Sequence, residues 1–304
     1  MAPDHTISSS EPLPPPVHPL KVVRYAKWGG YSPRQWAVSI AKTEWPTGAT
    51  CLKAGDRGSV WRVTLTPQKR ELDCVVKVEP CSKLTDQARI ALRISRFHRQ
   101  WAGAEMLHKH TVLTGRPKAI LLGAKGKDRR VALLLDALPG RTVLEHVADP
   151  ETTFATESRV ATALGQNLAL MKSKGVVNRD HKPSNLIACP LDPDHPDGPF
   201  MIGVIDTMGV DRSLQGRGDA SLWWLFACLV IEPTGIGQPP RQALRMRVAR
   251  NTFAALHPKK SLAKPKHRAA WKAWRNAAWA QVRSLVDVHG DPTPKDNPLT
   301  EPRA

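Results

Sequence analysis

The sequence has few cysteines, no long apolar run and no classical hydrolase motif. Its five cysteines are scattered and include no Cys-x-x-Cys pair, so neither a disulfide framework nor a zinc site is predicted. We expect reduced, mostly buried thiols. The longest uncharged apolar run, Leu222 to Ile231, is far shorter than the roughly 20 residues of a membrane-spanning helix. No Gly-x-Ser-x-Gly motif is present, and no transmembrane segment is predicted.

The two ends of the chain lack the patterns of folded or targeting segments. No apolar stretch follows a basic start at the N-terminus, so we expect no secretory signal and a cytoplasmic location. Residues 1–20 contain six prolines and residues 291–304 contain four more. This composition predicts a disordered, proline-rich tail at 1–20 and a flexible tail at 291–304. The length between them suits one large domain or two lobes.

Acidic residues are missing from one long stretch of a strongly basic chain. The 304 residues include 45 Lys and Arg against 27 Asp and Glu, a net charge of +18. From Pro233 to Val286 there are 12 Lys and Arg and no acid. This stretch indicates either contact with phosphate groups or an ordinary solvated face. Within it, tryptophan and aliphatic residues recur at helical spacing from Trp271 to Leu285, which predicts a C-terminal helix whose tryptophans belong to the core.

The first half of the folded region alternates predicted strands with one predicted helix. Residues 59–65 and 73–78 are typical of strands joined by a hairpin connection, which begins a small antiparallel sheet. Residues 86–110 are predicted to be helical. Residues 130–138 form a predicted buried strand closed by Pro139-Gly140.

The second half contains a helix followed by two short strands. An apolar face at spacings of four, four and three predicts a helix that ends at Gly175. Apolar residues 186–188 and 201–205 then flank a turn-rich segment, which predicts a pair of strands. Their pairing is expected to bring together the polar residues at their outer ends, Asn185 and Asp206.

Residues 178–185, with the sequence NRDHKPSN, resemble the protein-kinase catalytic loop H-R-D-L-K-P-x-N and differ from it at the first and fourth positions. The resemblance implies that Asp180 orients and deprotonates an acceptor hydroxyl. It implies that Lys182 neutralises the γ-phosphate of ATP and that Asn185 binds Mg²⁺ through its amide oxygen. In the family, the histidine that Asn178 replaces supports the loop and performs no chemistry.

Residues 203–209, with the sequence GVIDTMG, occupy the place of the kinase D-F-G metal motif. Asp206 follows a predicted strand, as the motif requires, and is expected to be the second Mg²⁺ ligand. Thr207 and Met208 stand between this aspartate and Gly209, so switching controlled by a phenylalanine is not expected.

Two upstream segments complete the resemblance. Gly55, Gly58 and Ser59 form a shortened glycine-rich segment whose backbone N–H groups are expected to cover the phosphates of ATP. The next strand carries Val75-Val76-Lys77, which resembles V-A-I-K and its phosphate-binding lysine. Glu105 in the predicted helix is the expected partner of Lys77.

The pattern spans roughly Lys53 to Gly209, about half of the chain, and is most similar to the Kdo/WaaP lipopolysaccharide kinases. This resemblance implies an α+β, two-lobed protein-kinase-like fold, with a small antiparallel-sheet N-lobe at 21–138 and a mainly helical C-lobe at 139–290. It implies ATP and Mg²⁺ as cofactors and a lipopolysaccharide core sugar or related anionic glycolipid as acceptor. The basic stretch 241–283 would then contact the surface of the inner membrane peripherally.

Two other classes stay open. A protein Ser/Thr kinase or RIO-like kinase would use the same residues on a protein or nucleic-acid-containing partner. No Ala-Pro-Glu tripeptide is present, and only residues 210–220 separate Gly209 from the next apolar helix, which favours a non-protein hydroxyl. A pseudokinase scaffold would bind ATP without transferring phosphate.

Overall fold

The chain folds into two compact units. The structure is a computed structural model that describes residues 21–26, 49–55, 57–66, 71–123, 129–195, 198–212, 219–260 and 262–290. The first unit comprises the described parts of Met1–Trp101 and Gly115–Ala137, and the second those of Ala102–Thr114 and Leu138–Ala304. The sequence predicts an N-lobe that ends at residue 138 and therefore includes residues 102–114. The structure groups residues 102–114 with the second unit. Both predicted tails lie outside the described residues.

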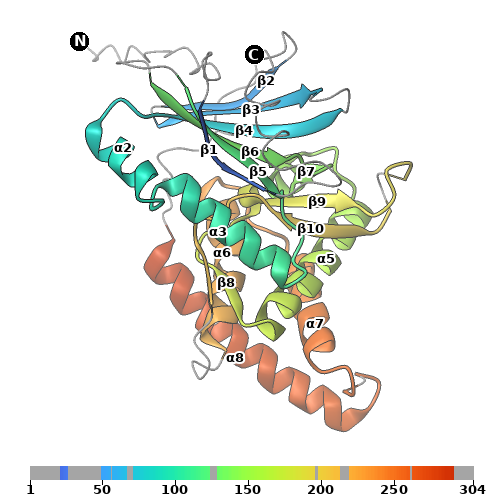
Figure 1. The fold of residues 1–304 in the computed structure, drawn as a ribbon. Coiled ribbons are helices and arrows are strands. Elements are labelled where there is room, and N and C mark those ends of the chain that lie inside the picture. The colour runs from blue at the N-terminus through green and yellow to red at the C-terminus, as the bar shows by residue number, and fades with distance from the viewer. Residues whose placement is uncertain are drawn as a thin grey trace, which may run out of the picture. The chain divides into compact units, whose positions relative to one another are not determined.

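The first unit is built on a six-stranded antiparallel sheet (Figure 1). The strand order across the sheet is β1-β5-β6-β4-β3-β2. The strands are β1 (Lys21–Tyr25), β2 (Thr50–Gly55), β3 (Gly58–Leu65), β4 (Leu72–Pro80), β5 (Pro117–Leu122) and β6 (Arg130–Asp136). The predicted hairpin is confirmed, because β3 pairs with β4 in a register that places Ser59 opposite Val78 and Leu65 opposite Leu72.

Side chains along these strands point alternately to the two faces of the sheet, and each face carries its own hydrophobic core. In β4, Cys74, Val76 and Val78 are buried on one face. On the other face, Leu133 and Leu135 of β6 pack with Phe97 and Trp101 of helix α3 (Arg96–Lys109). Successive side chains of a strand point to opposite faces, so the apolar strands supply both cores.

The helix predicted over residues 86–110 is two helices, and the single-helix prediction is wrong. Helix α2 covers Leu84–Ala91 and α3 begins at Arg96. Between them Arg93 has a φ of 59°, a left-handed conformation that no helix continues through. The Ser95 hydroxyl then accepts a hydrogen bond from the His98 backbone N–H at 3.4 Å. Serine at this position favours a new helix start over continuation of the old one.

The second unit is mainly helical (Figure 1). Its helices are the remainder of α3, α4 (Val143–Ala148), α5 (Phe154–Ser173), α6 (Ala220–Gly235), α7 (Gln242–Leu256) and α8 (Pro265–His289). Its strands are β7 (Arg141–Thr142), β8 (Val176–Asn178), β9 (Leu186–Pro190), β10 (Phe200–Val204) and β11 (Val210–Arg212), and the 3₁₀ helix η2 covers Pro183–Asn185. β10, β9 and β7 form one small sheet, and β11 and β8 pair separately.

Helix α5 lies in the core of this unit and packs closely on α7. A Cβ on Gly165 would lie 2.6 Å from the Val248 carbonyl oxygen, so only glycine permits this approach. The Thr252 hydroxyl donates to the Gly165 carbonyl at 3.1 Å. Helix α5 ends as predicted, because Gly175 follows it with a φ of 63°.

The tryptophans of α8 are half-buried and pack against the core, in agreement with the prediction that they are structural. Trp274 meets Trp223 of α6 edge to face, with ring centroids 5.2 Å apart, and stacks on Trp271. Ala278 and Val282 are buried on the same side of α8. Helix α8 therefore packs directly on α6.

The predicted α+β class is confirmed, with an antiparallel-sheet unit followed by a helical one. All five cysteines are free thiols, four of them buried. No helix in the described part of the chain combines the length and apolar character needed to cross a membrane.

Candidate functional site

The predicted catalytic loop lies in the second unit, between two strands that fix its ends. β8 ends at Asn178 and pairs with β11, placing Asn178 opposite Val210. η2 closes the loop, and β9 begins directly after it at Leu186. β9 pairs with β10 in a register that places Leu186 opposite Val204. The end of the loop and the start of the metal motif are therefore neighbours, as predicted.

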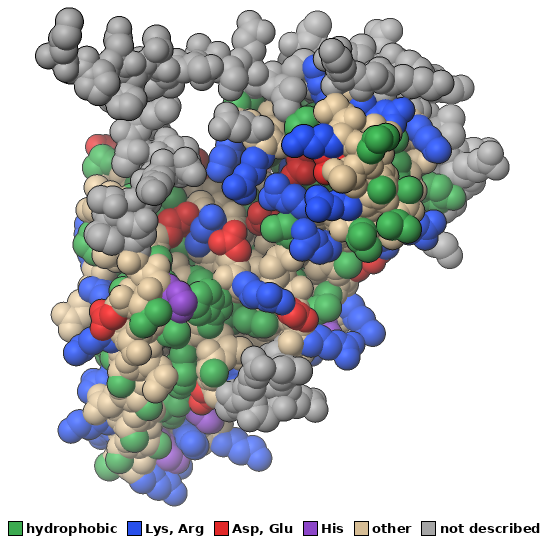
Figure 2. Space-filling view, turned by 90° about the vertical axis from the view of Figure 1, so that its left-hand side faces the viewer, with side chains coloured by type: hydrophobic (Ala, Val, Ile, Leu, Met, Phe, Trp, Pro, Cys, Tyr) green, Lys and Arg blue, Asp and Glu red, His purple; other side chains and the backbone are tan. Residues whose placement is uncertain are grey.

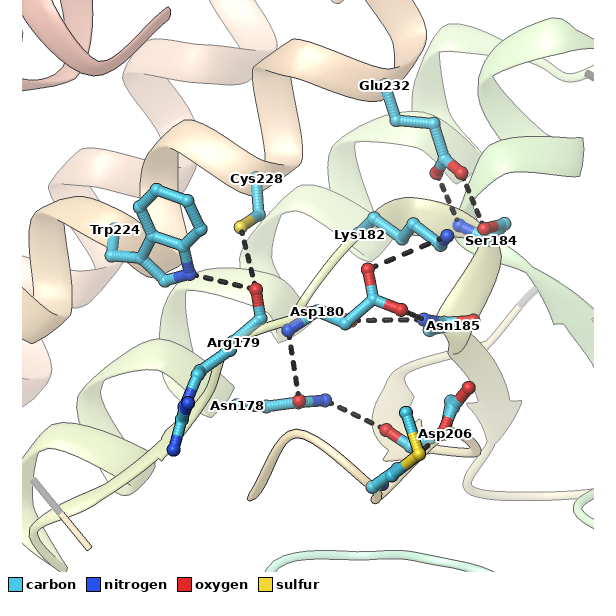
Figure 3. Close-up of polar contacts among 11 residues, drawn as sticks. Asn178, Arg179, Asp180, Lys182, Ser184, Asn185, Asp206, Trp224, Cys228 and Glu232 are labelled. Atoms are coloured by element: carbon cyan, nitrogen blue, oxygen red, sulfur yellow. Dashed lines mark hydrogen bonds and ion pairs between the residues drawn. The ribbon is translucent and has the colours of Figure 1, made fainter. Parts of the chain in front are cut away.

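Asn178 joins the catalytic loop to the metal motif. Its side chain is fully buried. The Nδ2 group donates to the Asp206 carbonyl at 3.0 Å, and Oδ1 accepts from the Asp180 backbone N–H at 3.1 Å (Figure 3). A buried amide whose N–H and oxygen both form hydrogen bonds holds the neighbouring groups in one arrangement. The residue that departs from the kinase pattern therefore supports the loop through its own amide.

Asp180, Lys182 and Asn185 converge on one point of the loop (Figure 3). Asn185 Nδ2 donates to Asp180 Oδ2 at 2.8 Å and to the Asp180 carbonyl at 3.1 Å. Lys182 Nζ lies 3.6 Å from Asp180 Oδ1. About half of the Asp180 side chain and 40% of that of Lys182 remain exposed. The carboxylate is thus fixed in orientation and open to solvent.

Asn185 and Asp206 have the chemistry of magnesium ligands. Because both Asn185 contacts use Nδ2, its amide oxygen is the end of the side chain left for a cation. Asp206 is half-buried, and its Oδ1 accepts from the Met208 backbone N–H at 3.2 Å. The described residues contain no group of three or more His, Cys, Asp or Glu that could hold a metal by itself. Mg²⁺ is usually bound through one or two protein oxygens and keeps water or phosphate as its other ligands.

Helix α6 supports the loop through residues that the sequence prediction missed. Trp224 Nε1 donates to the Arg179 carbonyl at 2.9 Å (Figure 3). Glu232 accepts twice from Ser184, from its backbone N–H at 2.8 Å and from its hydroxyl at 2.6 Å. A glutamate within an otherwise apolar helix was the available signal, because a half-buried carboxylate needs donors. Spacing alone did not identify Ser184 as the donor.

Burial perturbs the protonation of two groups beside the loop. His181 is fully buried, and burial lowers its pKa to about 3, so the ring is neutral. Burial also raises the pKa of the Cys228 thiol to about 12, and Cys228 Sγ lies 3.9 Å from the Arg179 carbonyl. On the surface, a hydrogen bond from Arg179 lowers the pKa of Asp211. That contact, at 2.9 Å, joins the loop to β11.

Helix α3 approaches the metal motif at a glycine. A Cβ on Gly103 would overlap the Thr207 carbonyl oxygen. Thr207 is itself buried, with 2% of its surface exposed. The residue in place of the kinase phenylalanine is therefore enclosed, with α3 against its backbone.

The predicted nucleotide residues of the first unit lie at the β2–β3 hairpin. Gly55 pairs with Gly58, whose φ of 139° is a conformation that favours glycine. A side chain on Gly58 would also overlap the Val78 carbonyl. The Ser59 hydroxyl is buried and accepts from Trp61 Nε1 at 2.8 Å. The Ser59 side chain is thus engaged within the hairpin.

Lys77 and Glu105 belong to different units. Lys77 is half-buried in β4, and its cross-strand partners are Val60 of β3 and Leu133 of β6. Glu105 is exposed on α3. Their predicted pairing stays a prediction.

Comparison with known proteins shows a distant structural similarity and no match at the level of sequence. The sequence matches no protein-family description and no curated protein. The structure is similar to the crystal structure of the BubR1 kinase domain, with 8% sequence identity and a TM-score of 0.40, over 82% of this chain and 84% of that chain. The resemblance to the Kdo/WaaP family stays a prediction.

Proposed function

We propose that this chain is a protein-kinase-like phosphotransferase that moves the γ-phosphate of ATP to a hydroxyl group in the presence of Mg²⁺. The observation that carries the proposal is the arrangement around Asp180. Its carboxylate is fixed by Asn185 at 2.8 Å, faces Lys182 at 3.6 Å and remains half exposed. A carboxylate oriented by an amide and accessible to solvent suits a base that receives the proton of an acceptor hydroxyl.

Each residue of the loop has a role in this reaction. Asp180 orients the acceptor hydroxyl and accepts its proton as the oxygen forms a bond to the γ-phosphorus and the bond to ADP breaks. Lys182 places a positive charge where negative charge develops. Asn185 and Asp206 offer the two oxygens for Mg²⁺, which when bound neutralises the phosphates. In the first unit, the β2–β3 hairpin and Lys77 are proposed to bind ATP, and Glu105 to pair with Lys77.

An anionic glycolipid, such as a lipopolysaccharide core sugar, is the proposed acceptor. Of the 12 Lys and Arg between Pro233 and Val286, ten are exposed. Among the described residues, Arg241 is the only one of the twelve in an ion pair, with Glu157. On the face drawn in Figure 2, Lys and Arg side chains far outnumber Asp and Glu. Uncompensated cations attract phosphate-bearing surfaces, such as a layer of anionic lipid.

The test is transfer of labelled γ-phosphate from ATP with Mg²⁺, offering lipopolysaccharide core acceptors beside generic protein substrates. We expect label on the glycolipid. Asp180→Asn keeps an oxygen for the Asn185 hydrogen bond but removes the base, so turnover should fall by about 10²-fold or more while ATP binding is kept. Asp206→Ala should remove the Mg²⁺ dependence of nucleotide binding. The exposed Asp287→Asn on α8 is the matched control and should behave as the unaltered chain.

The outcomes separate the alternatives. Label on protein alone would move the chain to the protein-kinase or RIO-like class. ATP binding without transfer to any acceptor would favour a pseudokinase scaffold. Unchanged turnover in Asp180→Asn would contradict the role of Asp180 as base, whatever the acceptor.

A further inference from the structure

Exposed apolar side chains gather on helix α2 and the turn that follows it. Of the nine large hydrophobic residues that are exposed in the described chain, three lie in this one short segment. They are Leu84, Leu92 and Ile94, with exposed fractions of 83%, 69% and 57%. Single exposed apolar residues are normal on a protein surface, whereas a contiguous group of them marks an interaction site. Figure 1 shows α2 at the margin of the first unit.

Helical spacing places these residues on one face of α2. Leu84, Ala88 and Leu92 are four positions apart, so they are neighbours along the helix surface, and all three are exposed. The opposite face holds Ile90, which is 6% exposed and belongs to the core that the sheet shares with α3. The helix is therefore fixed to the protein by one face, and its other face presents aliphatic side chains to solvent.

The turn after α2 extends this apolar face and adds a cation to it. Arg93 has a φ of 59°, and its backbone N–H donates to the Ile90 carbonyl at 3.1 Å. The Ile94 N–H donates to the Arg89 carbonyl at 2.9 Å. This pair of hydrogen bonds is the Schellman motif, which folds the residue at the position of Ile94 back against the last turns of the helix. Glycine is the usual residue at the left-handed position, yet an arginine occupies it here. The α2 stripe is the set Leu84, Ala88, Leu92 and Ile94.

Positive charge surrounds the α2 stripe. Residues 82–99 contain five Lys and Arg and one acid. Lys83 precedes Leu84 directly. Arg93 stands between Leu92 and Ile94, so a cation adjoins each end of the stripe. Within the described chain, the ion pairs of this segment involve its other arginines, and these two cations have no acidic partner.

We propose that the α2 stripe is a docking surface for an anionic lipid layer. Its aliphatic side chains enter the boundary between headgroups and acyl chains, and Lys83 and Arg93 contact the lipid phosphates. Aliphatic residues beside uncompensated cations are the composition of helices that lie in the membrane interface. The stripe belongs to the first unit, whereas the basic stretch 241–283 belongs to the second. The inference therefore does not rest on the proposed function.

Two other kinds of partner fit these observations less well. A nucleic acid would use the cations, but it also gains affinity from aromatic side chains on which bases stack, and the α2 stripe has none. A second protein chain would need roughly 800 Å² on each partner for a stable contact. The eight residues of α2 extend only about 12 Å, so this surface is too small to hold a protein by itself.

The test is sedimentation of the full chain with vesicles in the absence of ATP, comparing phosphatidylcholine alone with phosphatidylcholine mixed with phosphatidylglycerol. We expect binding that requires the anionic lipid. Leu84→Gln should weaken this binding about tenfold or more, because one leucine side chain is no longer removed from water. The matched control is Leu191→Gln, which changes an exposed leucine outside the α2 stripe and should leave binding unchanged.

Arg93→Gly separates a loss of charge from a loss of folding. Glycine suits the left-handed conformation, so this variant should keep its midpoint in urea denaturation. It should bind the anionic vesicles about fivefold more weakly, the effect of one cation lost from an anionic surface. Lys174→Gln removes an exposed cation that belongs neither to the α2 segment nor to the stretch 241–283. This control should keep the affinity of the unaltered chain.

The outcomes decide what the α2 stripe binds. Absence of binding that requires the anionic lipid, or equal affinities of Leu84→Gln and Leu191→Gln, would overturn the proposal. A concentration-dependent dimer that is lost in Leu84→Gln would overturn it too and would assign the stripe to a second copy of the chain. Phosphate transfer is not measured in this experiment, so its failure and the failure of the proposed kinase activity are distinguishable.

Discussion

His181 makes the stability of the helical unit sensitive to acid. It follows Asp180 in the loop and is fully buried. Both ring nitrogens lack hydrogen-bond partners within the described part of the chain. A buried neutral ring in such a place resists protonation, because the charged form would lose its hydration without compensation. The kinase pattern has leucine at this position, so His181→Leu is the natural substitution for isolating the effect.

The size of the effect follows from the shift in pKa. Burial lowers the pKa of His181 from 6.5 to about 3. Between these values the unfolded chain binds a proton that the folded chain does not, so stability rises with pH and is lost as pH falls below about 6.5. At about 1.4 kcal/mol per pH unit, acidification from about pH 7 to about pH 5 should lower the unfolding free energy by about 2 kcal/mol through this residue.

The assay is urea denaturation of the unaltered chain and of His181→Leu at several values of pH between these limits. We expect the difference in unfolding free energy between the two proteins to grow by about 2 kcal/mol toward the acid end, with the variant the more stable. Burial also lowers the pKa of His98 and His257, but both proteins retain these groups, so their effect cancels. Parallel curves for the two proteins would refute the reasoning.

Two further substitutions test the supports of the site. Glu232→Gln removes the charge of the side chain that accepts two hydrogen bonds from Ser184. Chemical denaturation should show that the unfolding free energy falls by about 1–3 kcal/mol. An unchanged denaturation midpoint would contradict the anchoring role of Glu232. Gly103→Ala places a methyl group on the Thr207 carbonyl and should cost about 1–3 kcal/mol by the same measurement. Its control is Gly55→Ala, whose methyl group meets open space; equal losses in the two variants would show that the close approach is not the cause.

Local patterns predicted the elements that carry the site. The apolar face of α5, the two short strands after the loop and the polar residues at their ends were enough to place Asn185 and Asp206 as neighbours, because strand pairing has a fixed register. The break between α2 and α3 was missed. Helical spacing continued through it, and the left-handed conformation of Arg93 left no mark in the sequence.

The support of the loop could not be predicted from spacing. Asn178 appeared as a departure from the kinase pattern, yet its two hydrogen bonds, to the Asp206 carbonyl and from the Asp180 N–H, make it the link between loop and metal motif. Glu232 lies 48 positions from the Ser184 it binds. Contacts between residues so far apart depend on how helices pack, which the periodicity of each helix does not encode.

The sequence by itself determined the residues of the candidate site: a loop with a carboxylate, a lysine and an amide at kinase spacing, two oxygen-bearing side chains at strand ends, and a basic C-terminal stretch. These follow from residue type and short-range geometry. Only the tertiary structure decided which groups orient Asp180 and that His181 is buried without hydrogen-bond partners in the described chain. Burial arises where several elements meet, so no single segment of sequence specifies it.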